Sequence, residues 1–124
     1  ERFPHLRFVQ LEHELGWIPF FLDRIDYVYR ERPMMITRRF ADGSVPTDYM
    51  RANVFHSFQE DALGMRGRDI IGVDNLLWGS DYPHLESTFP RSHQILDRVM
   101  EGVSDDERER ITRRNTASLY GLSG

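Results

Sequence analysis

Segments with the two-residue period of a strand alternate along this chain with segments that have the spacing of a helix. Residues 6–11 alternate apolar and polar side chains, residues 53–58 return to strand character, and residues 76–78 form a short apolar run. Helical segments separate these strands, which is the pattern of a parallel sheet with helical crossovers. The chain is therefore predicted to have an α/β fold with about three parallel strands.

The first helical segment, residues 17–30, carries a stripe of large apolar side chains. Trp17, Phe20, Phe21, Ile25 and Val28 recur at helical spacing, so this stripe is predicted to face the core. The tryptophan is expected to be one of the core residues.

Later helices have recognisable ends. Ser104 and Glu107 form a capping box, and Gly121 suits the C-cap of the helix that follows, so one helix is predicted from there to about residue 120. The other predicted helices or helical turns lie near residues 46–50, 61–65, 68–73 and 92–100.

Composition excludes several classes of function. A chain of 124 residues has the size of one domain, and a net charge of −4 gives no electrostatic case for nucleic acid. No apolar run approaches the roughly 20 residues of a membrane span, and no signal peptide is recognisable, so a cytoplasmic protein is expected. Without cysteine or lysine, this chain cannot supply a thiolate ligand, a thiol nucleophile or a Schiff base.

Ionisable side chains follow the predicted strands at the points where the strands end. Asp81 and His84 come directly after residues 76–78, where Pro83 prevents the strand from continuing. Because the carboxyl ends of parallel strands share one edge, such side chains should gather on one rim. The residues expected there are Glu12, His13, Glu14, Ser57, Gln59, Asp81 and His84.

Each of these residues also has a structural interpretation. Asp81 could cap the following loop through an Asx turn, and His84 could be a surface or packing residue. His13, between two glutamates, could act as an acid or base, or could be a solvated rim histidine. His56 could face either side of its strand, and packing is the favoured interpretation.

Four blocks of the chain form a recognisable set. They are Phe3-Pro4 through Gly16-Trp17-Ile18-Pro19 with Arg24 and Asp26, then residues 53–58, then Ile71-Gly72 through Asp74-Asn75-Leu76-Leu77-Trp78-Gly79-Ser80-Asp81-Tyr82-Pro83-His84, and finally Asn115-Thr116-Ala117-Ser118-Leu119-Tyr120-Gly121-Leu122. In this order the blocks resemble the amidohydrolase-related (amidohydrolase 2) family of metal-dependent barrel enzymes, which includes aminocarboxymuconate-semialdehyde decarboxylase and the resorcylate decarboxylases.

The resemblance implies a distorted (β/α)8 barrel, of which residues 1–124 supply about strands six to eight as a C-terminal fragment. It makes Asp81 a metal ligand that also takes part in proton transfer, with zinc as the expected metal and manganese as the alternative. His13 occupies the place of a catalytic histidine in the decarboxylases. Glu12, Tyr82 and His84 are expected to bind substrate.

The family's other metal ligands have no counterpart here. The resemblance places a first-strand His-x-His or Glu-x-His and a fifth-strand histidine upstream of residue 1, and this chain contains no His-x-His. Because a catalytic metal normally needs about three protein ligands, we expect the parent protein to be active and the isolated chain to need a partner for activity.

Three functional hypotheses follow. The first is a segment of a metal-dependent hydrolase acting on a small carboxylated or cyclic carbonyl substrate. The second is a non-oxidative decarboxylase of the same family. The third is a catalytically inert barrel segment that acts only through association, because open strand edges at both ends favour pairing with another copy as a homo-oligomer.

Overall fold

The computed structural model describes residue 3 and residues 5–122, so Pro4 of the Phe3-Pro4 motif lies outside the described residues. No helix in these residues is long and apolar enough to cross a membrane. The elements are β1 (Phe8–Gln10), α1 (Ile18–Glu31), η1 (Pro33–Met35), α2 (Pro46–Asn53), β2 (Val54–Phe58), α3 (Ala62–Arg66), α4 (Arg68–Ile71), η2 (Val73–Asn75), β3 (Leu76–Trp78), α5 (Ser92–Val99), α6 (Asp105–Glu109), η3 (Arg110–Arg114) and α7 (Asn115–Tyr120).

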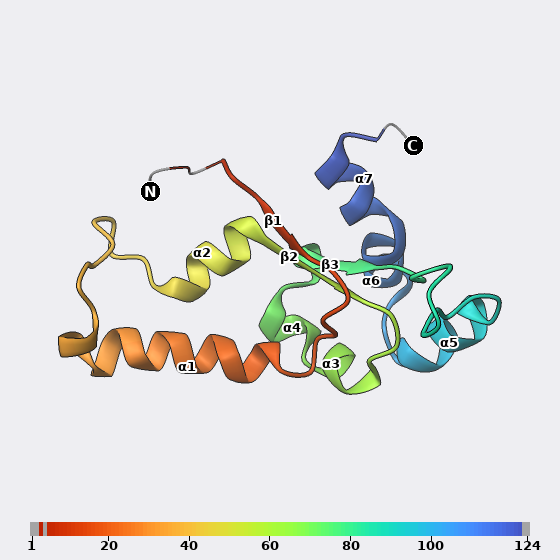
Figure 1. Ribbon diagram of the computed structural model, residues 1–124, viewed down its shortest axis with the longest axis horizontal. Helices are drawn as coiled ribbons and strands as arrows, with labels where there is room; N and C mark the ends of the chain where they lie inside the picture. Colours follow the sequence, from red (N-terminus) through yellow and green to blue (C-terminus); the bar gives the residue numbers. More distant parts are fainter. Residues whose placement is uncertain (1–2, 4, 123–124) are drawn as a thin grey trace.

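The three predicted strands form one parallel sheet in the order β1-β2-β3 (Figure 1), which confirms the α/β prediction. Gln10 lies opposite His56, and Ser57 lies opposite Leu77. β1 is shorter than the alternation of residues 6–11 predicts, since only three of its residues join the ladder. The outer edges of β1 and β3 pair with no strand among the described residues.

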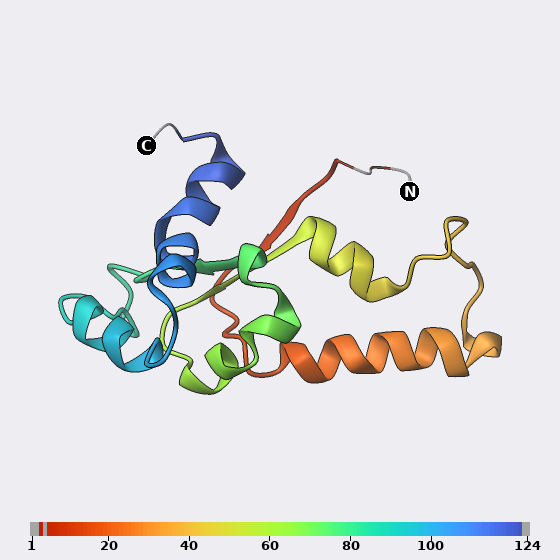
Figure 2. The same cartoon turned by 180° about the vertical axis from the view of Figure 1, so that it is seen from behind.

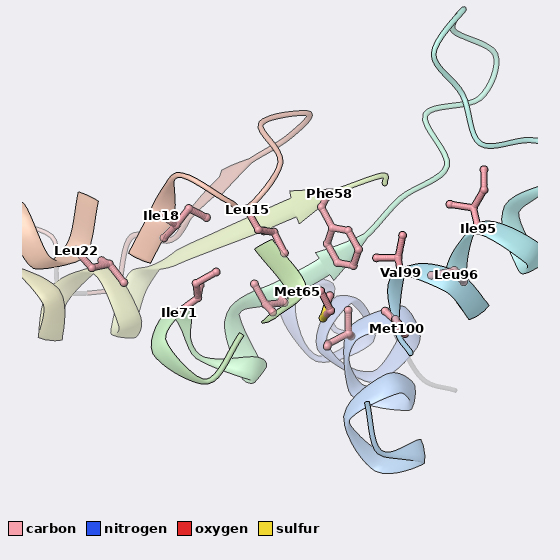
Figure 3. Close-up of a cluster of buried hydrophobic side chains, with 12 residues drawn as sticks. Leu15, Ile18, Leu22, Phe58, Met65, Ile71, Ile95, Leu96, Val99 and Met100 are labelled. Atoms are coloured by element: carbon pink, nitrogen blue, oxygen red, sulfur yellow. The ribbon is translucent and has the colours of Figure 1, made fainter. Parts of the chain in front are cut away.

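One face of the sheet packs against helices. Phe58 of β2 and Leu76 of β3 are fully buried in the main hydrophobic cluster. Figure 3 shows Phe58 pointing away from its strand toward Met65 and Val99 of the helices, and the turned view of Figure 2 brings the C-terminal helices in front of β3. Because side chains alternate along a strand, Ser57 points to the opposite face.

The apolar stripe predicted for α1 is correct only in its second half. Ile25 packs against the core and Val28 is partly buried, whereas Trp17 is 39% exposed, Phe20 is 72% exposed and Phe21 is also exposed. The buried residues of this helix are Ile18, Leu22 and Tyr29. The aliphatic side chains pack inward, and the tryptophan indole N–H lies outside and donates to the carbonyl of His13. Large apolar residues on both sides of this helix made the inward face ambiguous in the sequence.

Asn75 joins the start of β2 to the turn that precedes β3. Its side-chain Nδ2 donates to the carbonyls of Arg51 and Val54 at 2.7 and 2.8 Å. Since both carbonyls lie where α2 passes into β2, one buried amide satisfies backbone groups that the change of element would leave without a partner.

The C-terminal helix begins and ends as predicted. Ser104 accepts the N–H of Glu107 as the N-cap, and Gly121 adopts the left-handed conformation at the C-terminus. A π-helical turn, η3, joins α6 to α7 within this helix. Asn115, at the start of α7, donates through Nδ2 to the carbonyls of Val73 and Leu76, both at 2.8 Å, and so ties the helix to β3.

His56 is packed on the helical side of the sheet, which confirms the packing interpretation. It is only 3% exposed, and its Nδ1 has no hydrogen-bond partner among the described residues. Gln10, directly opposite on β1, likewise has a buried Oε1 that no described residue contacts through a hydrogen bond. Burial disfavours the charged imidazolium and lowers the pKa of His56 to about 4.

Replacing His56 with phenylalanine should make the protein less sensitive to mild acid. Because the folded-state pKa of about 4 lies below the ordinary 6.5, the unfolded state takes up the proton first as pH falls. The stability that neutral His56 contributes is therefore present above pH 6.5 and is lost as pH falls toward 4. One proton limits the slope to about 1.4 kcal/mol per pH unit.

Urea unfolding across this pH range measures the effect. His93→Phe is the matched control, because His93 is exposed on α5 and should leave the pH dependence unchanged. A wild-type pH dependence in His56→Phe would contradict the prediction.

Candidate functional site

The turn that follows β1 has an unusual backbone. Glu12 and Glu14 adopt left-handed φ angles of 58° and 51°, a region that residues with a side chain rarely enter. Such conformations cost on the order of 1 kcal/mol each, so contacts outside the turn must hold it.

Glu14 makes one of these contacts, across to the loop that follows β2. Its carboxylate accepts the backbone N–H groups of Gln59 and Glu60 at 3.4 and 3.3 Å. Burial raises the pKa of Glu14, while the same two N–H groups act in the opposite direction. The side chain therefore spans two rim loops rather than pointing into solvent.

Asp61 makes the reciprocal contact from the β2 loop. Its Oδ2 accepts the N–H groups of Leu15 and Gly16, each at 2.7 Å, and its Oδ1 accepts the N–H of Gly64 at 2.7 Å. Each loop thus donates backbone hydrogen bonds to a carboxylate of the other. We refer to Glu14 and Asp61 together as the β1–β2 clasp.

Ser57 anchors the other end of the turn. Its Oγ, on the sheet face opposite the helices, accepts the backbone N–H of Glu12 at 3.4 Å. The carboxylate of Glu12 is thereby held at the carboxyl ends of the strands, where the polar rim was predicted.

The loop after β3 is closed at its base. The carbonyl of Ser80 accepts both the N–H of Thr88, at 3.0 Å, and the hydroxyl of Ser87, at 2.8 Å. Thr88 is almost fully buried, and its Oγ1 lies 2.9 Å from the hydroxyl of Ser92 at the start of α5. The carbonyl of Ser80 therefore holds the two ends of the loop together.

Large apolar side chains of this loop, and of the residue just after it, are exposed. The rings of Tyr82 and Phe89 meet edge to face with centroids 4.9 Å apart, and both side chains are exposed. Leu85 projects fully into solvent. The β3 loop therefore places an apolar surface beside the polar rim.

Asp81 and His84 form a pair at the start of this loop. His84 donates its backbone N–H to the carbonyl of Asp81 at 2.9 Å, and its Nδ1 lies 3.0 and 3.1 Å from the two oxygens of the Asp81 carboxylate. Asp81 also has a left-handed φ of 56°. The imidazole is thus placed to orient the carboxylate.

Glu12, Asp81 and His84 come together although the chain separates the first from the others. One ligand atom of each lies within 4.8 Å of the others. Two carboxylate oxygens and an imidazole nitrogen are donors that Zn²⁺ and Mn²⁺ both accept, so this set fits a divalent cation. We refer to these three residues as the rim cluster.

Three of the residues predicted for the site thus lie together, and two do not. His13 is exposed and lies outside the rim cluster, and Tyr82 is exposed on the β3 loop, also outside the cluster. Both neighbour the rim cluster in sequence, but the left-handed turn and the loop direct them elsewhere. The chemical roles assigned to all five residues stay predictions.

The clasp and the contact from Ser57 were not predicted. Asp61 had one local signal, since it precedes a helical turn and caps it through Gly64. Nothing in the sequence indicated that the same carboxylate would also reach Leu15 and Gly16, more than forty residues earlier.

A family model described as amidohydrolase matches residues 1–122. Many solved structures are similar, and three of them are described in turn. A 5-carboxyvanillate decarboxylase from Sphingomonas paucimobilis is 22% identical with a TM-score of 0.78, and the match covers 98% of this chain and 36% of that one. An amidohydrolase from Mycobacterium avium subsp. paratuberculosis K-10 is 28% identical with a TM-score of 0.72, covering 95% and 29%.

The third structure is a dihydroxybenzoic acid decarboxylase from Polaromonas sp. JS666. It is 18% identical with a TM-score of 0.71, and the match covers 98% of this chain and 35% of that one. That structure contains manganese and the inhibitor 2-nitroresorcinol. This chain therefore spans about a third of the length of each of these structures.

Replacing Gly64 with alanine should break the clasp. A Cβ at this position would lie 2.6 Å from the backbone nitrogen of Gly16 and would also collide with Asp61 and with the Cβ of Leu15. We expect a loss of about 1–3 kcal/mol in the free energy of unfolding, measured by urea denaturation.

Gly79→Ala is the matched control, because a Cβ there would meet nothing within 4 Å. Its stability should stay within about 0.5 kcal/mol of the wild type. Equal stabilities of the two variants would show that the close approach of the loops at Gly64 is unimportant.

Proposed function

The chain belongs to the amidohydrolase family, and from that membership we propose that it is part of a metal-dependent barrel enzyme that hydrolyses a small carboxylated or cyclic carbonyl substrate. The convergence of Glu12, Asp81 and His84 at the carboxyl ends of parallel strands supports this proposal most directly. In barrel enzymes, that end of the strands carries the chemistry.

In this proposal the chain forms about strands six to eight of a (β/α)8 barrel domain. The face of the sheet opposite the helices, to which Ser57 points, would then face the barrel interior. The open edges of β1 and β3 would pair with the remaining strands, or with another copy of the chain.

Glu12, Asp81 and His84 would hold a divalent cation, zinc or manganese, together with ligands from the rest of the barrel. The manganese in the Polaromonas relative is consistent with a metal of this kind. When bound, the cation would polarise a carbonyl or carboxylate oxygen of the substrate.

The chain's own side chains would handle protons and orientation. In hydrolysis, Asp81 would accept a proton from the attacking water at a carboxylate oxygen and pass it to the leaving group as the acyl bond breaks. His84, which is 3.0 Å from that carboxylate, would keep it in the productive orientation. Glu12 and Tyr82 would contact the substrate, and His13 would act as an acid or base if substrate draws it toward the site.

A non-oxidative decarboxylase is the second candidate. It is favoured by the two decarboxylases among the structures of similar fold, one of which acts on 5-carboxyvanillate. Hydrolysis and decarboxylation can both use a polarising cation and a carboxylate that moves a proton.

A catalytically inert segment is the candidate from another class, since the chain spans about a third of the length of its structural relatives. Metal analysis of the purified protein distinguishes it. Stoichiometric, tightly bound zinc or manganese favours a site completed by other residues, whereas its absence favours the inert segment.

Replacing Asp81 with asparagine in the complete protein should lower kcat by at least about 100-fold, because the amide cannot take up a proton. Turnover would be followed with 5-carboxyvanillate and with a small lactone as probes. Glu86→Gln removes the same charge from the exposed part of the same loop and should leave kcat unchanged. Full activity of Asp81→Asn would refute the role proposed for this residue.

The two reaction classes differ in their products. If the protein is a hydrolase, the lactone probe should open to a hydroxy acid without release of carbon dioxide. If it is a decarboxylase, 5-carboxyvanillate should release one equivalent of carbon dioxide, measured in a coupled assay. Carbon dioxide release with no ring opening would decide for the second candidate.

A further inference from the structure

The position of Glu12 is determined by more than its own turn. Glu12 and Glu14 flank a single residue, His13, and both are held in left-handed conformations. A turn with two such residues is intrinsically unfavourable, so it exists only while its anchors hold it. Any change that releases one end of the turn must therefore move the carboxylate of Glu12.

The anchors lie at both ends of the turn. At one end, the hydroxyl of Ser57 on β2 accepts the backbone N–H of Glu12. At the other end, Glu14 reaches the backbone N–H groups of Gln59 and Glu60 through both of its oxygens. Hydrogen bonds therefore hold the turn at both ends, to β2 at Ser57 and to the loop that follows β2.

The backbone N–H groups of Gln59 and Glu60 require a side chain with two acceptor oxygens, which the carboxylate of Glu14 provides. The two N–H groups it accepts come from consecutive residues, and each faces a different oxygen of the carboxylate. A glutamine has one acceptor oxygen, and its amide NH₂ would face the second N–H as a donor. An apolar residue would accept neither bond.

We propose that Glu14 is a positioning residue of the active site, holding the β1 turn so that the carboxylate of Glu12 stays within reach of Asp81 and His84. This inference rests on the proposed function. Glu14 is not a member of the rim cluster; it acts through Glu12, and the contacts of Asp61 keep its loop in place.

The test compares Glu12→Gln, Glu14→Gln and the double variant in the complete protein. Two quantities are measured: kcat/KM with whichever probe the enzyme turns over, and Mn²⁺ affinity by calorimetry. Glu14→Gln should lower kcat/KM about tenfold or more and weaken Mn²⁺ binding. In the double variant the two losses should not add, so it should resemble Glu12→Gln within about twofold.

Glu60→Gln is the matched control. It removes a carboxylate from the same rim, but that side chain pairs with Arg98 on the outside, and its backbone N–H still reaches Glu14. This control should keep the wild-type kcat/KM and the wild-type Mn²⁺ affinity.

Three results would overturn the inference. The first is wild-type kcat/KM and Mn²⁺ affinity in Glu14→Gln. The second is a double variant in which the losses of the single variants multiply, since Glu14 would then act independently of Glu12. The third is a Glu14→Gln protein that does not fold by circular dichroism, because Glu14 would then serve the fold.

Failure of the proposed function has a different signature. If Asp81→Asn keeps full activity, the rim cluster is not the active site, whatever Glu14 does. If Asp81→Asn is inactive while Glu14→Gln matches the wild type, the proposed function stands and only the positioning role falls.

Discussion

Hydrogen bonds from backbone N–H groups to two acidic side chains, Glu14 and Asp61, join the loops at the carboxyl ends of β1 and β2. These hydrogen bonds affect both the core and the rim of the sheet. Toward the core, the clasp fixes Leu15, which is fully buried between the sheet and the helices. Toward the rim, it holds the turn that carries Glu12. One set of contacts therefore serves both packing and the candidate site.

At the opposite end of the sheet, side-chain amides satisfy backbone hydrogen-bonding groups, as the carboxylates of Glu14 and Asp61 do at the rim. Asn75 and Asn115 each donate two hydrogen bonds to backbone carbonyls where one element passes into the next. Carbonyls need donors and N–H groups need acceptors, so the choice between amide and acid at each end follows from which backbone groups the strands leave free. Neither asparagine touches the candidate site.

Periodicity was sufficient to predict the strands and most of the helices, because each depends on neighbours within a few residues. The alternation of strands and helices along the chain then predicted the parallel sheet. Asp81 and His84 were found for the same reason, since they directly follow a buried strand. The contacts of Glu14 and Asp61 join residues about 45 positions apart and have no period, so no local pattern could reveal them. Only the first turn of α1 was mispredicted: Trp17 and Phe20 are the larger apolar residues there, but the smaller Ile18 and Leu22 pack into the core.

The carbonyl of Ser80 closes the β3 loop at its base. This closure separates the position of the Asp81 carboxylate from the apolar surface farther along the loop. Asp81 lies next to the closure, whereas Leu85 lies at the exposed middle of the loop, which is its tip. Substitutions at the tip would change the surface met by an incoming molecule without disturbing the carboxylate behind it. Sequence changes at the tip can therefore accumulate independently of the geometry of the rim cluster.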